Sequence, residues 1–120
     1  MTVEIEFNQH IAAAVAPVIV YMNRAHDGAV RPLIVQRLIS KVDSELGTTQ
    51  ARIQLDIFAP TYEQAKELAV LAEGAFRTFD AADTFAVYRG NELETFDDLV
   101  GLHRVILDAM LRFEERPIFG

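Results

Sequence analysis

The stretch from Ala51 to Phe79 constrains the fold most, because it changes from a strand pattern to a helix pattern within a few residues. Its first part alternates apolar and polar residues, the period of two that places one apolar row on one face of a sheet. The apolar row consists of Ile53, Leu55, Ile57 and Ala59. Pro60 ends this pattern, because proline has no N–H to donate to a strand ladder. We therefore expect a half-buried strand followed by a sharp turn.

A long amphipathic helix is predicted directly after this turn, over residues 61–79. Thr61 followed three residues later by Gln64 is typical of a capping box at a helix start. The apolar residues that follow recur at the three- and four-residue spacing of a single helical stripe. They are Ala65, Leu68, Ala69, Ala72, Ala75, Phe76 and Phe79. We expect this stripe to pack on the apolar face of the preceding strand.

The N-terminal half contains three further candidate elements. We expect a helix from about Glu6 to Val15, although Thr2–Phe7 alternates as a short strand would. Val18–Met22 is continuously apolar, which predicts a short strand covered on both faces. Leu33–Val42 predicts a longer strand, whose core face would consist of Ile34, Gln36, Leu38, Ser40 and Val42.

The C-terminal half contains a turn signal and an ambiguous segment. Phe85–Tyr88 and Glu92–Phe96 flank Arg89-Gly90-Asn91, which indicates a small hairpin or an ordered excursion. Leu99–Phe113 fits strand alternation and a helical stripe about equally well. The elements together predict an α+β domain, with a mostly antiparallel sheet of about four strands and the long helix across one face.

Length and composition limit the class of protein. One hundred and twenty residues suffice for a single domain with its own core, and the absence of Cys excludes disulfides and thiolate metal sites. The acidic N-terminus does not resemble a signal peptide, and the longest apolar run, Ile11–Met22, is shorter than a membrane span. The net charge of −7 argues against tight nucleic-acid binding, yet suits an acidic wall past which DNA slides.

The sequence contains no pattern typical of catalysis. Its three histidines, His10, His26 and His103, lack the spacing of a helical metal pair. The carboxylates gather in polar segments rather than in contrasting environments, and the glycines are too scattered for a phosphate-binding loop. We therefore expect no enzyme, cofactor or metal site.

The pattern of strands and helix resembles the tail terminator (tail completion) proteins of long-tailed bacteriophages and gene transfer agents. The resemblance rests on the strand and helix of residues 51–79, on Pro32–Ser40 as the preceding strand and on Gly101–Asp108 as the closing strand. It covers roughly Val18–Glu115 and implies one tail-terminator-like domain over residues 1–120. It also favours a strand, beginning near Leu102, in the ambiguous C-terminal segment.

The resemblance implies a structural role in the virion. Such proteins form rings, typically of six subunits, at the head-proximal end of the tail tube. The ring stops tube polymerisation, provides the joining surface for the head connector and lets DNA pass. It implies assembly in the host cytoplasm and partners that are a tail tube protein and a connector or neck protein, with no membrane.

Two groups of residues are expected to make the contacts of such a ring. Arg52, Asp56 and Phe58 share the polar face of their strand, and the resemblance to proteins that assemble implies that a neighbouring subunit covers this face. The alternative subunit contact is the tail with Ile118 and Phe119. The tube or connector contact is expected in polar loops that contain Glu45, Thr48, Arg89, Asn91 and Glu92.

Two other functions are compatible with the sequence. The first is another neck or minor tail component, such as a stopper or a tube-like protein. The second is a small metal-dependent enzyme that uses His26 and Asp27 with nearby carboxylates.

Overall fold

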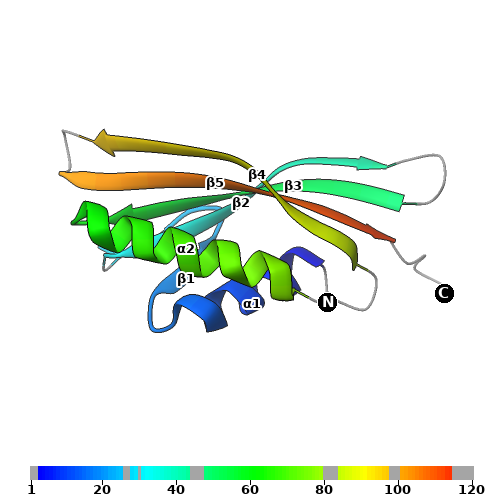
Figure 1. Ribbon diagram of the computed structural model, residues 1–120, viewed down its shortest axis with the longest axis horizontal. Coiled ribbons are helices and arrows are strands. Elements are labelled where there is room, and N and C mark those ends of the chain that lie inside the picture. Colours follow the sequence, from blue (N-terminus) through cyan, green and yellow to red (C-terminus); the bar gives the residue numbers. More distant parts are fainter. Residues whose placement is uncertain are drawn as a thin grey trace.

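The computed structural model describes residues 3–25, 28–29, 31–43, 48–79, 84–97 and 101–114. These residues form two helices and five strands on an α+β plan, as predicted, with one strand more than expected. The elements are α1 (Val3–Val15), β1 (Ile19–Met22), β2 (Leu33–Asp43), β3 (Thr48–Ala59), α2 (Tyr62–Thr78), β4 (Thr84–Asp97) and β5 (Leu102–Glu114). Both helices lie on the same side of the sheet (Figure 1).

The sheet has the strand order β1-β2-β3-β5-β4, so β3 lies at its centre. β1 is parallel to β2, whereas the other three pairs are antiparallel. β3 and β5 pair without interruption from Thr48 opposite Glu114 to Ala59 opposite His103. The long strands extend beyond the end of α2 (Figure 1), and the molecule measures 47 × 25 × 23 Å.

The hydrophobic core lies between the sheet and the helices. Ile53, Leu55 and Ile57 of β3 are fully buried, which confirms the predicted apolar row. The predicted stripe of α2 is also buried from Ala65 to Phe76, with Phe79 partly buried against the same core. Strand and helix therefore pack on each other through the two faces that the sequence indicates.

α2 begins where the capping pattern predicts. Thr61 has an extended backbone, and its hydroxyl accepts a hydrogen bond from the Gln64 N–H at 3.2 Å. This bond satisfies one of the N–H groups that a helix start leaves without a partner.

α1 confirms the predicted N-terminal helix and begins at Val3, a few residues earlier than expected. It packs on α2 through aromatic rings, because Phe7 lies 5.8 Å from Phe76 and 5.2 Å from Phe79, measured between ring centres. His10 Nε2 lies 2.8 Å from the Ala75 carbonyl oxygen and 2.9 Å from Thr78 Oγ1. His10 therefore links α1 to the C-terminal end of α2 by hydrogen bonding.

Two expectations for the first strands were wrong. In β1 Val20 is buried and Tyr21 is partly buried, whereas Ile19 and Met22 are exposed, because β1 is an edge strand. In β2 the first four residues are all buried, Arg37 is partly buried and residues 38–43 are exposed, so no single core face runs through the strand. A bulge at Ile39 shifts the register, which moves Val42 to the face opposite Leu38. The buried Gln36 side chain has a partner in α1, since its Nε2 donates to the Glu4 carbonyl oxygen at 2.9 Å.

The predicted hairpin at residues 85–96 was also wrong, because these residues belong to the single strand β4. The turn signal marks a register shift between Arg89 and Glu92 instead. A Cβ on Gly90 would lie 2.9 Å from Asp108 Cβ, so glycine is required by close packing against β5. The ambiguous C-terminal segment is strand β5, as the resemblance favours.

Replacing Thr61 by Ala tests the helix cap. Because the substitution removes the acceptor for the Gln64 N–H, the free energy of unfolding should fall by about 1 kcal/mol. In a chain of this size that loss lowers the melting temperature by roughly 4 °C. Thermal unfolding followed by circular dichroism measures the shift. Thr61→Ser keeps the hydroxyl and should melt like the wild type; equal melting of all three proteins would contradict the cap.

Candidate assembly surface

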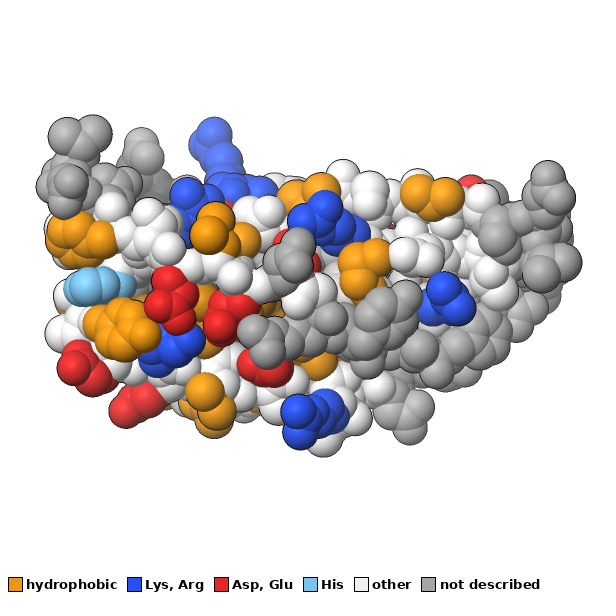
Figure 2. Space-filling model, turned by 45° about the horizontal axis from the view of Figure 1, so that its top comes forward, with side chains coloured by type: hydrophobic (Ala, Val, Ile, Leu, Met, Phe, Trp, Pro, Cys, Tyr) orange, Lys and Arg blue, Asp and Glu red, His pale blue; other side chains and the backbone are white. Residues whose placement is uncertain are grey.

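The face of the sheet that lies opposite the helices, here called the open face, carries the charged residues predicted for the subunit contact, Arg52 and Asp56. Arg52, Gln54, Asp56 and Phe58 of β3 alternate with the buried apolar row and so point to this face. Turned partly toward this face, Figure 2 shows charged side chains of both signs beside separate hydrophobic patches. The open face is therefore mixed in character rather than one continuous apolar patch.

Asp56 is the centre of a charged cluster on the open face. Its side chain is fully buried, yet Oδ2 lies 2.5 Å from Arg37 Nη1 and 2.9 Å from Arg104 Nη2. Gln54 Nε2 donates to Oδ1 at 2.9 Å. A carboxylate can be buried at tolerable cost only with partners of this kind. Asp56 thus connects β2, β3 and β5 within one subunit.

A second ion pair lies further along the open face. Arg52 Nη2 is 2.6 Å from Asp108 Oδ2, so β3 and β5 are joined a second time. The two residues border a surface hollow of about 450 Å³, which Gln54, Leu93 and Ile106 also line. Asp108 is nearly buried, whereas the Arg52 side chain is 43% exposed and can reach a partner outside the subunit.

Phe58 has neighbours within the subunit on both sides. The guanidinium carbon of Arg104 lies 5.4 Å from the centre of its ring, a cation–π distance. Phe58 also packs against a small second core formed by Ala29, Leu33 and Val35. The ring is therefore partly covered by its own chain.

β4 carries a third charged group where it approaches α2. Lys66 of α2 binds Glu94 directly and lies 3.5 Å from Glu92. Tyr62 donates its hydroxyl hydrogen to Glu94 at 3.2 Å. The hydrogen bond with Lys66 lowers the pKa of Glu94 and raises the pKa of Lys66, while desolvation opposes both shifts. Both groups are exposed, so water and salt weaken the pair.

The structure brings together some of the residues predicted for the subunit contact. Arg52, Asp56 and Phe58 share the open face, whereas Ile118 and Phe119 lie outside the described residues. Each of the three described residues already has a partner within the subunit.

The described residues among those predicted for the tube contact lie in strands rather than in loops. Glu45 lies outside the described residues. Thr48 begins β3 opposite Glu114, whereas Glu92 pairs with Leu107 nearer the middle of β5. Arg89 and Asn91 belong to β4 beside its register shift. The expectation of a polar loop at residues 89–96 is therefore corrected to an edge strand.

The residues that sequence reasoning missed are Arg37, Arg104 and Asp108, the partners of Asp56 and Arg52. The sequence does contain a signal for two of them. Arg104 and Asp108 are an even number of positions apart along β5, so they lie on the same face of that strand. Alternation along β5 does not predict how β5 is aligned with β3, because that register depends on pairing between strands distant in sequence.

The histidines stay apart in the structure. His10 joins the two helices, and His103 lies between Tyr62 and Phe96, with ring centres 6.0 and 4.8 Å away. His26 and Asp27 lie outside the described residues. Within the described ranges, no three His, Cys, Asp or Glu side chains are grouped as metal ligands. Neither described helix is long and apolar enough to span a membrane.

Comparison with known proteins gives a structural likeness without a sequence family. No family model and no curated protein matches the chain. Its fold is similar to that of a chain in a solved structure described as the virion of a native gene transfer agent particle, with a TM-score of 0.70. The match covers 94% of this chain and 95% of the other at 13% identity, so it shows a shared fold.

Replacing Asp56 by Asn tests the charged cluster. The amide keeps the shape of the side chain but removes the negative charge between Arg37 and Arg104. Because both arginines are partly exposed and can be hydrated, we expect a loss of roughly 2 kcal/mol in the free energy of unfolding. Urea denaturation measures it. Glu67→Gln, an exposed change on α2, should cost less than about 0.5 kcal/mol; equal losses would show that the cluster does not stabilise the sheet.

Titration of Glu94 tests the pair between α2 and β4. A carboxyl whose pKa is lowered on folding stabilises the fold above its unfolded pKa, and this contribution is lost as the pH falls through the folded value. Carboxyl chemical shifts in NMR should show Glu94 titrating below an isolated Glu. Lys66→Ala should raise the pKa of Glu94 toward the ordinary value. An unchanged titration in this variant would mean that Lys66 does not cause the shift.

Proposed function

We propose that this chain is a structural protein of a phage-like particle, specifically a tail terminator (tail completion) protein. In this role it forms a ring at the head-proximal end of the tail tube, stops tube polymerisation and provides the head–tail joining surface. The observation that carries the proposal is the likeness in fold, over 94% of the chain, to a chain of a gene transfer agent virion. The strand and helix pattern at residues 51–79 supports it independently.

The construction of the open face is consistent with a structural role. Its carboxylates Asp56 and Asp108 are each held by arginine, an arrangement that fixes neighbouring strands to one another. Catalytic acids and bases instead need groups whose proton affinities differ and that face a substrate. The charged residues described here are better suited to joining strands and subunits than to proton transfer.

The shape of the subunit supports a contact at the end where the strands extend past the helices. The sheet is long, and the ends of β2 and β3 extend past the helices (Figure 1). We propose that this end, with Glu45 and Thr48, contacts the tube, and that Ile118 and Phe119 contact a neighbouring subunit. A net charge of −7 favours a ring through which DNA passes without binding tightly.

The likeness to a virion chain also favours a second candidate, another neck or minor tail component, because the description of the matched structure covers the whole particle. The two candidates differ in position and number. A terminator forms one ring at one tube end, whereas a tube protein repeats along the tail.

The test uses the purified protein with growing tail tubes of its own phage. Because a terminator binds the tube end and then presents no copy of that end, tubes should stop elongating and show one extra ring at a single end in negative-stain images. Deleting the gene from the phage should give overlong or headless tails. The length distribution of the tubes is the measurement.

A heat-unfolded sample and an unrelated acidic protein of similar size serve as controls. Equal tube lengths with and without the protein, together with normal head–tail joining in its absence, would refute the terminator role. Copies spaced along the tube would support the minor-component alternative.

A further inference from the structure

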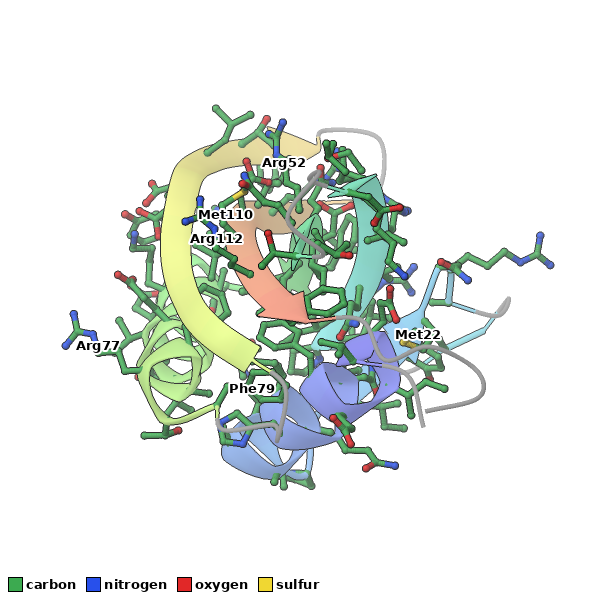
Figure 3. All side chains as sticks on the ribbon, turned by 90° about the vertical axis from the view of Figure 1, so that its right-hand side faces the viewer. Met22, Arg52, Arg77, Phe79, Met110 and Arg112 are labelled. Atoms are coloured by element: carbon green, nitrogen blue, oxygen red, sulfur yellow. The ribbon has the colours of Figure 1, made fainter. Side chains whose placement is uncertain are left out.

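Both edges of the sheet offer strands that lack an outer neighbour among the described residues. On one side β1 pairs only with Leu33–Gln36, so residues 38–43 of β2 continue beyond it as the outermost strand. On the other side β4 is outermost over its length. In the end-on view, β4 forms one side of the molecule and β1, with Met22, the opposite side (Figure 3). Unpaired strand edges are templates for pairing with another chain.

Both edges also expose large apolar side chains. On β2, Leu38, Ile39 and Val42 are 43%, 44% and 63% exposed. On β4, Leu93 and Phe96 are 60% and 47% exposed. Soluble proteins usually protect their edges with charge, and here the bulge at Ile39 and the neighbouring Lys41 provide limited protection. A partner that matches the bulged edge would cover these apolar groups.

The two edges differ in charge. Near the β1–β2 edge lie four cationic side chains, although Arg37 also binds Asp56 and Lys41 lies 3.7 Å from Glu4. The four are Arg24, Arg31, Arg37 and Lys41, and the same edge also carries Asp43, whose carboxylate accepts a hydrogen bond from the Thr49 hydroxyl at 2.8 Å. The β4 edge carries Glu92 and Glu94, and both carboxylates lie near Lys66 of α2. Opposite charges favour contact between unlike edges and disfavour contact between like edges.

A groove beside β4 adds a place for apolar side chains. Lys66, Glu67, Val70 and Leu71 of α2 line a groove of about 480 Å³. It lies toward β4, because Lys66 reaches Glu92 and Glu94. Val70 is 66% exposed, and Gly74 on the same helix has nothing within 4 Å of the position of a Cβ. An incoming strand can therefore approach α2 closely as it pairs with β4.

We propose that copies of this chain associate head to tail, with the basic β2 edge of one copy pairing with the acidic β4 edge of the next. Residues 38–43 add a strand to β4, and the apolar side chains on one face of this strand enter the groove along α2, since the bulge places Leu38 and Val42 on opposite faces. Such a contact joins two different surfaces, so it closes into a ring when the rotation between copies permits. The inference extends the ring of the proposed function by assigning its subunit contact.

The test is to alter each edge separately. Val42→Glu adds an acidic group to the basic edge, and Leu93→Lys adds a basic group to the acidic edge; both side chains are mostly exposed, so the subunit should fold. Wild-type protein should form oligomers in native mass spectrometry and sedimentation, and raised salt should weaken them. Each variant alone should be monomeric. A mixture of the two variants should associate, because the unaltered β4 edge of the Val42→Glu protein can pair with the unaltered β2 edge of the Leu93→Lys protein.

Gln9→Lys, an exposed change on α1, is the control and should assemble like the wild type. Melting curves verify that both edge variants are folded. The inference is overturned if the wild type stays monomeric, if either edge variant assembles as the wild type does, or if the mixture remains monomeric. Wild-type protein that halts tubes while the edge variants still assemble would overturn this contact but leave the proposed function. Assembly that depends on both edges but has no effect on tube length would support this contact and overturn the proposed function.

Discussion

The register of β3 is the constraint on which the rest of the structure depends. One face of this strand places Ile53, Leu55 and Ile57 under α2, while the other carries Arg52, Gln54 and Asp56. A slip of one residue would exchange the two rows, bury unpaired charges beneath the helix and expose the apolar row. The ion pairs from Asp56 to Arg37 and Arg104 form only when β2, β3 and β5 are aligned, so they reinforce the same register.

The sequence predicts the elements whose pattern is local and strong. The β3–α2 unit could be predicted because alternation, proline, a capping threonine and a helical stripe follow one another. β4 could not be predicted as one strand, because Arg89-Gly90-Asn91 is typical of a turn. In the structure Gly90 instead permits close packing against Asp108. The exposure of β1 depends on its place at the sheet edge, which is a matter of topology rather than of its own apolar residues.

The candidate site shows the same division between local and long-range information. Alternation along β3 correctly groups Arg52, Asp56 and Phe58 on one face. Their partners come from strands distant in sequence, so the burial of Asp56 follows only from the pairing of β3 with β2 and β5. Charge on a strand therefore predicts a polar face, but it does not distinguish an exposed contact from an internal ion pair.

The register shifts have a consequence for how the chain tolerates changes of length. They occur in β2 at Ile39 and in β4 near Ala86 and Gly90, whereas the pairing of β3 with β5 is continuous. At each shift the outer strand contains one residue more than its partner uses. Deleting one residue at a bulge would remove this surplus and leave the pairing on either side unchanged. The same deletion within β3 would displace every later pair, so insertions and deletions among homologues should concentrate in the outer strands.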